Sequence, residues 1–303
     1  MKVYFPKFDL DKIGGCWTFV RNLMQGLSFT SQPLDIEMVD NWQTADIYFI
    51  PGVTMVERNE VEEAKTAGKK IVLRMDNIPR KSRNKRCRVY DNLRRYAEIA
   101  DVVVYQSEWA RDYCYPLTGE GTVIYNGVNT KIFYPADNKP KTINQRVLFA
   151  YHGKSELKNF WQAHLHFQYF ARTYPNAEFW FIYDFGRDQP ILEAANFDFW
   201  QGEKYVHYNQ VKTPQEMAFI MRNCTHFFYP SIADAAPNIL LEAVACGLEA
   251  CHLAPKELAG SQEIYEDFKQ NGVRSIETMA LEYFNLFKLL VDEKEICLST
   301  NNN

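Results

Sequence analysis

YPSIADAAPNILLEAVACG, residues 229–247, sets two acidic side chains, Asp234 and Glu242, eight positions apart across the expected start of a helix. Pro237 suits the first position of that helix, because its missing N–H would have no partner there. The apolar residues that follow recur with helical spacing. Both carboxylates can accept hydrogen bonds from hydroxyl groups, so the segment predicts a site for a ligand that carries hydroxyls.

Three amides at the predicted helix start are expected to have no partner within the helix. They belong to Asn238, Ile239 and Leu240. A helix N-terminus carries roughly half a positive charge together with such unpaired donors, and it therefore favours a phosphate. The segment predicts one ligand that brings both a phosphate and sugar hydroxyls. As an alternative, Asp234 would serve only as the N-terminal cap of the helix.

Asp234, seven intervening residues and Glu242, followed by Ala-Val-Ala-Cys-Gly, closely resemble the E-x7-E signature of the retaining glycosyltransferases of family four, which have the two-domain GT-B fold. Three further places along the chain resemble that family in the right order. They are the glycine-rich segment 14–23, similar to the family's first loop, the segment 125–129, similar to its interdomain segment, and Lys158, similar to its diphosphate lysine. The resemblance covers residues 1–255 and implies two Rossmann-like α/β domains that face each other across a cleft.

The resemblance also implies roles for the matching residues. Lys158 would neutralise the donor diphosphate, and Glu242 would bind the hydroxyls of the ribose. Asp234 stands where the family usually has a glutamate and would contact the hydroxyls of the donor sugar. Gly14 and Gly15 would let the backbone approach the donor closely, with a plain turn as the alternative.

Two departures from the family pattern bear on the expected chemistry. The family usually has an arginine five residues before its lysine, whereas this chain has Gly153 there, and Lys154 would substitute for it as a point charge. Many members have a histidine in the first domain, but all six histidines of this chain lie beyond residue 138. A base-assisted mechanism would have to use Asp76 as the base. A front-face mechanism, in which the leaving phosphate oxygen takes the acceptor proton, needs no protein base and is the one expected.

Arg74 and Asp76 follow the strand predicted at 71–73, at the edge of the sheet where ligands of open α/β proteins bind. Asp76 is expected to be a catalytic-site residue that orients the acceptor. Arg74 is expected to contact a phosphate or the acceptor. An Arg74–Asp76 pair that only holds the end of the strand is the alternative.

The run 80–95 contains eight Lys or Arg side chains and a single acid. With Arg80 and Arg83 as candidate acceptor contacts, it would recognise an anionic glycan or a lipid-linked acceptor at the periphery of a membrane. A solvated basic surface is the alternative. Nucleic acid is not expected as a partner, because the run lacks an interleaved aromatic platform.

Short apolar runs alternate with helical stretches along the chain, which is the pattern of parallel α/β sheets. Strands are predicted at 3–5, 47–50, 71–73, 102–105, 123–125, 147–150, 178–182, 205–208 and 226–229, helices at 160–173 and 214–222, and a linker at 135–145. The expected parts are an acceptor-side domain at 1–138, a nucleotide-sugar-binding domain at 139–275, a C-terminal helix at 276–298 that crosses back to the first domain, and a disordered tail at 299–303.

Composition narrows the class of protein. A chain of 303 residues with 47% hydrophobic content suits two compact domains, and a net charge of -4 gives no general reason to bind nucleic acid. The seven cysteines form no C-x-x-C pair, and no signal peptide or membrane span is apparent, so a cytoplasmic protein with reduced thiols is expected. His164 and His166 fall on different faces of a helix, so no metal or other cofactor is expected.

The sequence therefore predicts a metal-independent glycosyltransferase that moves a hexose-like unit from a nucleotide diphosphate sugar to a hydroxyl of a glycan, glycolipid or glycoprotein. Two other functions stay open. One is a non-catalytic protein of the same fold that binds a sugar nucleotide or a partner. The other is a nucleotide-sugar epimerase, which the absence of histidines from the first domain disfavours.

Overall fold

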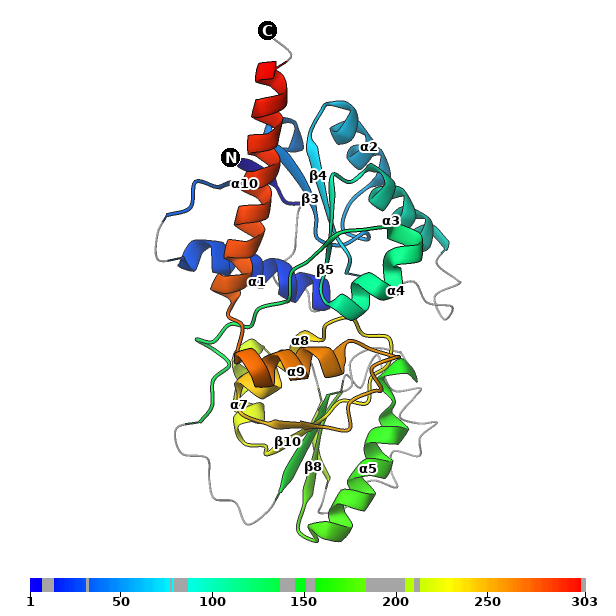
Figure 1. The fold of residues 1–303 in the computed structure, drawn as a ribbon. Coiled ribbons are helices and arrows are strands. Elements are labelled where there is room, and N and C mark those ends of the chain that lie inside the picture. The colour runs from blue at the N-terminus through cyan, green and yellow to red at the C-terminus, as the bar shows by residue number, and fades with distance from the viewer. Residues whose placement is uncertain are drawn as a thin grey trace. The chain divides into compact units, whose positions relative to one another are not determined.

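The computed structural model describes residues 1–6, 14–30, 33–76, 78, 87–136, 145–150, 156–183, 205–209 and 213–300. The chain divides into two compact units (Figure 1), of which the first comprises residues 1–127 and 274–303 and the second residues 128–273. Among the described residues, each unit contains one parallel sheet. The predicted domain boundary at residues 138 and 139, and most of the predicted linker, lie outside the described residues.

The sheet of the first unit has six parallel strands in the order β2-β1-β3-β4-β5-β6. Its strands are β1 (Lys2–Tyr4), β2 (Glu37–Val39), β3 (Ile47–Ile50), β4 (Lys70–Arg74), β5 (Val102–Tyr105) and β6 (Thr122–Val123). The four residues of β3 are all buried, because helices cover both faces of the sheet. Such a strand shows an unbroken apolar run in place of an alternating pattern.

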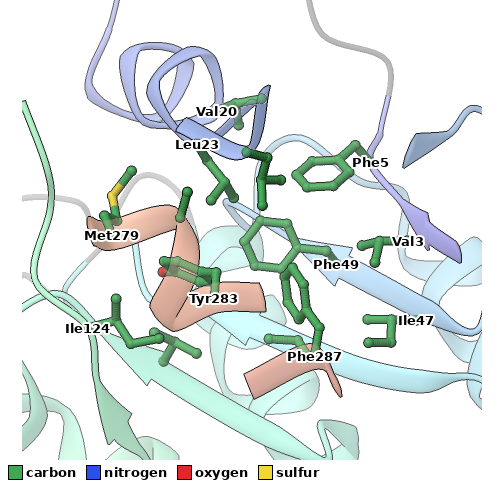
Figure 2. Close-up of a cluster of buried hydrophobic side chains, with 14 of the residues drawn as sticks. Val3, Phe5, Val20, Leu23, Ile47, Phe49, Ile124, Met279, Tyr283 and Phe287 are labelled. Carbon is green, nitrogen blue, oxygen red and sulfur yellow. The ribbon is translucent and has the colours of Figure 1, made fainter. Parts of the chain in front are cut away.

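The described part of the first unit contains five α-helices. They are α1 (Gly15–Phe29), α2 (Arg58–Thr66), α3 (Cys87–Ile99), α4 (Glu108–Thr118) and α10 (Ile276–Thr300), with a short 3-10 turn η1 (Trp42–Thr44). Figure 2 shows α1 and α10 against one face of the sheet, where Phe49 of β3 packs against the rings of both Tyr283 and Phe287. On the opposite face, Tyr48 donates a hydrogen bond of 2.7 Å to Glu60 of α2.

The sheet of the second unit has five parallel strands in the order β11-β10-β7-β8-β9. They are β7 (Arg146–Ala150), β8 (Glu178–Tyr183), β9 (Tyr205–Asn209), β10 (His226–Phe228) and β11 (Glu249–Cys251). The helical elements are η3 (Glu156–Lys158), α5 (Phe160–Thr173), α7 (Pro214–Arg222), α8 (Asn238–Ala245) and α9 (Ser261–Asn271). Phenylalanine rings of β7, β8 and β10 pack against α5 and form the core on that face.

Most of the predicted elements are present, and two strands were missed. The bounds of β3, β5, α5 and α7 are those predicted, whereas β2 and β11 have no counterpart among the predictions. Each of these two has three residues, lies at an edge of its sheet and contains a glutamate, so the apolar signal is weak.

The helix α10 packs against α1 at a close crossing. A Cβ atom on Gly26 of α1 would lie 2.2 Å from the carbonyl oxygen of Ile276 and 2.8 Å from Cβ of Ala280. The crossing therefore requires a residue without a side chain at Gly26. Within the described part of the chain, no helix, α10 included, has the length and apolarity needed to cross a membrane.

We expect Gly26→Ala to destabilise the first unit by about 1–3 kcal/mol, because the added methyl group must push two backbones apart. Gly15→Ala is the matched control, since a Cβ on Gly15 would meet no atom within 4 Å. The free energy of unfolding in urea measures both. A Gly26→Ala variant as stable as the control would show that α1 and α10 are not in close contact at this point.

Candidate functional site

The strongest candidate site lies where the strand order of the second sheet reverses direction. The chain runs from β7 outward through β8 and β9, and then returns to add β10 and β11 on the other side of β7. In open α/β sheets, ligands bind beyond the carboxyl ends of the strands at such a switch point. Lys158 follows β7, and Asp234 follows β10, the strand that pairs directly with β7.

Three side chains meet at this edge within hydrogen-bond distance of one another. The ammonium of Lys158 donates to Asp234 Oδ2 at 3.1 Å and to the hydroxyl of Tyr229 at 3.2 Å. The same hydroxyl donates to Asp234 Oδ2 at 2.6 Å. We call these residues, Lys158, Tyr229 and Asp234, the switch-point triad. The sequence predicted that Lys158 and Asp234 would lie in one site, and the structure brings them together.

The protonation states of the triad follow from burial and charge. Burial alone would lower the pKa of Lys158, but the interactions with Tyr229 and with the Asp234 carboxylate raise it above its usual value. Burial raises the pKa of Tyr229, and the charge of Asp234 raises it further. Lys158 is therefore a cation and Tyr229 a neutral phenol at physiological pH. The Lys158 and Asp234 side chains are about one quarter exposed, at 23% and 26%, so a ligand can reach both.

Hydrogen bonds to backbone carbonyls fix the loops that carry the triad. The amide of Ile232 donates to the carbonyl of Leu157 at 2.9 Å, and the side-chain amide of Asn159 donates to the carbonyl of Pro230 at 2.8 Å. Ala233, next to Asp234, has a φ of 56°, a left-handed conformation that is strained for a residue with a side chain. The loop after β10 is thus held against the segment after β7.

The helix α8 begins at Asn238, and Pro237 is its N-cap residue. Pro237 was predicted at the first helical position, so the helix starts one residue later. The amide of Leu240 was predicted to be free, but it donates to the carbonyl of Pro237 at 3.1 Å. Asn238 and Ile239 are both half-buried, and their contact with a donor stays a prediction. Glu242 is half-buried in the body of the helix.

Arg74, at the end of β4 in the first unit, is buried with 1% of its surface exposed. Its guanidinium donates to the carbonyl of Pro51 at 3.2 Å, to Gln106 Oε1 at 2.7 Å and to Asn126 Oδ1 at 3.3 Å. The ring of Phe19 stacks on it, 3.6 Å from ring centroid to Cζ. These contacts disagree with the expectation that Arg74 presents its charge to an acceptor or phosphate. They indicate that it joins the ends of neighbouring strands.

Asp76 lies two residues beyond Arg74 and is half-buried. Its Oδ1 accepts a hydrogen bond of 3.2 Å from the amide of Val53, just after β3. A Cβ on Gly52 would lie 2.8 Å from Asp76 Oδ2 and 2.7 Å from Cys16 Sγ, so only glycine fits between these groups. Asp76 is thus held in a fixed place at the carboxyl edge of the first sheet, and its catalytic role stays a prediction.

The structure describes some of the other predicted site residues and not the rest. Gly14 is the N-cap of α1, with a φ of 149°, and Gly15 is the exposed first residue of that helix. Lys154, Arg80 and Arg83 lie outside the described residues. Two described members of the basic run have acidic neighbours, as Arg95 lies 3.1 Å from Glu62 and Arg94 lies 3.5 Å from Glu98. Tyr229 was predicted only as part of a buried strand, and no sequence signal indicated its hydroxyl contacts.

The two histidines of α5 have different surroundings. His164 is buried, and burial lowers its pKa to about 4. His166 stacks on His252 with the ring centroids 3.8 Å apart. Among the described residues, no group of three or more His, Cys, Asp or Glu side chains could hold a metal ion. Metal-independent chemistry stays a prediction.

No protein-family model matches the chain, and no curated protein matches it significantly. Solved structures do resemble it. The crystal structure of Anabaena Alr3699/HepE with UDP-glucose has a TM-score of 0.61 and 13% identity, over 99% of this chain and 100% of that one. Sucrose-phosphate synthase from Thermosynechococcus elongatus has a TM-score of 0.59 and 12% identity, over 99% of this chain and 98% of that one. The lipopolysaccharide outer core galactosyltransferase WaaB, in its apo form, has a TM-score of 0.54 and 15% identity, over 97% of this chain and 100% of that one. These structures are GT-B proteins, so the predicted GT-B fold is confirmed.

We expect Arg74→Met to destabilise the protein by at least about 3 kcal/mol, because three buried acceptors lose a charged donor. Arg94→Met is the control. The Arg94 side chain is 64% exposed, so its loss should cost less than about 0.5 kcal/mol. Urea unfolding measures both. If Arg74→Met keeps full stability and only weakens acceptor binding, the original expectation of an acceptor contact is right.

We expect the protein to lose stability as the pH falls from 6.5 to about 4, partly through His164. In the unfolded chain this histidine binds a proton near its ordinary pKa of 6.5, whereas in the folded protein it stays neutral down to about 4. Each unit of pKa difference corresponds to about 1.4 kcal/mol, so the free energy of unfolding should fall by up to about 3 kcal/mol through this histidine. His164→Gln should show a shallower pH dependence of the unfolding free energy. An unchanged slope would contradict the burial of this imidazole.

Proposed function

We propose that this protein is a retaining glycosyltransferase that moves a sugar from a nucleotide diphosphate sugar to a hydroxyl acceptor. The observation that carries the proposal is the meeting of Lys158 and Asp234 at the switch point of the second sheet. One cation and one carboxylate at that edge match the two parts of a sugar nucleotide, the phosphates and the sugar hydroxyls. The GT-B fold, which the neighbouring glycosyltransferases share, supports the same assignment.

The donor would contact three parts of the second unit. Lys158 would bind the diphosphate, Asp234 the hydroxyls of the sugar, and Glu242 those of the ribose. The N-terminus of α8, with Asn238 and Ile239, would add a partial positive charge toward the phosphates. HepE was solved with UDP-glucose, so UDP-glucose is the first donor to test, ahead of GDP, ADP and dTDP sugars.

The reaction would break the bond between the anomeric carbon and the phosphate oxygen and form a bond to the acceptor oxygen on the same face. The acceptor proton would pass to the phosphate oxygen that leaves, so no protein base and no metal is required. Lys158 would stabilise the negative charge that develops on the leaving diphosphate, which is the largest electrostatic requirement of the reaction. Asp76 would orient the acceptor hydroxyl.

The acceptor would be a glycan or a lipid-linked sugar. The basic run 80–95, with Arg80 and Arg83, would bring the protein to an anionic acceptor at the periphery of a membrane. Binding to vesicles that contain anionic lipid, compared with vesicles of neutral lipid alone, separates this role from that of a solvated basic surface.

We expect UDP to bind the wild-type protein, and we expect Lys158→Met and Glu242→Gln each to weaken that binding at least about tenfold, because each removes a charged hydrogen-bond partner. Isothermal titration calorimetry measures the dissociation constants, with GDP, ADP and dTDP titrated in parallel. The matched controls are Lys269→Met and Glu266→Gln, which replace exposed side chains of α9. Equal affinity in site and control variants would contradict the donor site.

Turnover separates catalysis from binding alone. Release of UDP from UDP-glucose in the presence of an acceptor, with the anomeric configuration of the product retained by NMR, supports the transferase. Donor binding without transfer or hydrolysis would identify a non-catalytic protein of this fold.

A further inference from the structure

The charges of Lys158 and Asp234 compensate each other within the switch-point triad. The Lys158 cation and the Asp234 anion form an ion pair at 3.1 Å, and both also contact the Tyr229 hydroxyl. An incoming diphosphate competes with Asp234 for the same ammonium group. Binding of a donor through Lys158 therefore requires that this ion pair loosens, which leaves the charge of Asp234 to be held by other donors.

The side chain of Tyr229 is held more firmly than that of Lys158. Tyr229 is only 2% exposed, and its ring stacks on the ring of Phe227 with the two centroids 5.7 Å apart. Its hydroxyl makes the shortest contact of the triad, 2.6 Å to Asp234 Oδ2. Lys158, by contrast, reaches the triad through a flexible four-carbon chain with 23% exposure.

We propose that Tyr229 is a positioning residue of the donor site, whose hydroxyl holds the Asp234 carboxylate when Lys158 turns from Asp234 to the diphosphate of the donor. The inference rests on the proposed function and extends it to a residue outside the predicted site. Asp234 then keeps a fixed direction toward the sugar hydroxyls in the loaded site. The Tyr229 hydroxyl already donates to Asp234 Oδ2 while Lys158 is paired with it, so this contact does not have to form anew when the lysine turns away.

The ion pair between Lys158 and Asp234 should weaken the binding of free UDP. In the wild-type protein, UDP must draw Lys158 away from Asp234, whereas in Asp234→Asn the ammonium has no carboxylate to leave. Asp234→Asn should therefore bind UDP more tightly than the wild type, even though it removes a predicted contact to the donor sugar. Ordinary loss of a binding residue would give the opposite sign.

A double-mutant cycle on UDP affinity tests the proposal. We expect Tyr229→Phe to weaken UDP binding about tenfold, because the bound state loses the hydrogen bond that holds a charged carboxylate. In the Asp234→Asn background, the same Tyr229→Phe change should alter UDP affinity less than about twofold, because no charge is left to hold. Tyr169→Phe, at a tyrosine of α5 with 55% exposure, is the control and should leave affinity unchanged.

Turnover of UDP-glucose gives a second readout. We expect kcat per folded molecule to fall in Tyr229→Phe, because Asp234 is misplaced in the loaded site. A purely structural tyrosine would lower the melting temperature and leave kcat per folded molecule as it was.

The outcomes separate the two proposals. Additive effects of Tyr229→Phe and Asp234→Asn on UDP affinity, or weaker UDP binding by Asp234→Asn, would overturn the positioning role while leaving the donor site intact. If none of UDP, GDP, ADP or dTDP binds the wild-type protein, the proposed function fails and this inference fails with it.

Discussion

Parallel strands all end at one edge of a sheet, and this constraint decides where the chain can assemble polar groups. In each unit the inner strands are largely apolar and buried, so polar side chains collect in the loops that leave the carboxyl edge. Adjacent strands bring together residues that are far apart in sequence. Lys158 and Asp234 are 76 positions apart, and they meet because β7 and β10 pair directly.

Arg74 at the edge of the first sheet and Lys158 at the edge of the second differ in burial. Arg74 is almost fully enclosed, and its partners are the neutral oxygens of Pro51, Gln106 and Asn126. These partners follow β3, β5 and β6, so the guanidinium ties the ends of the first sheet together. Lys158 is one quarter exposed and is paired with a carboxylate. An enclosed cation with several fixed partners suits a structural role, whereas an accessible and exchangeable pair suits ligand binding.

The sequence predicted the fold well because its strongest patterns are local. The apolar run of β3 and the helical periodicity of α5 each lie within one short segment, and their bounds were correct. The edge strands β2 and β11 were missed because three residues with a glutamate among them carry little signal. The burial of Arg74 could not be predicted, since it depends on partners from three other segments.

The pairing of Lys158 with Asp234 bears on which ligands the proposed donor site would accept. Separating Lys158 from Asp234 removes a favourable contact from each charged group, and a bound ligand must supply a replacement contact to each group. A free sugar offers hydroxyl donors to Asp234 but no negative charge to Lys158, and a free diphosphate offers the reverse. A sugar nucleotide brings both in one molecule, with the phosphate and the sugar covalently linked. The ion pair would therefore favour the complete donor over either part, because only the donor compensates both charges at once.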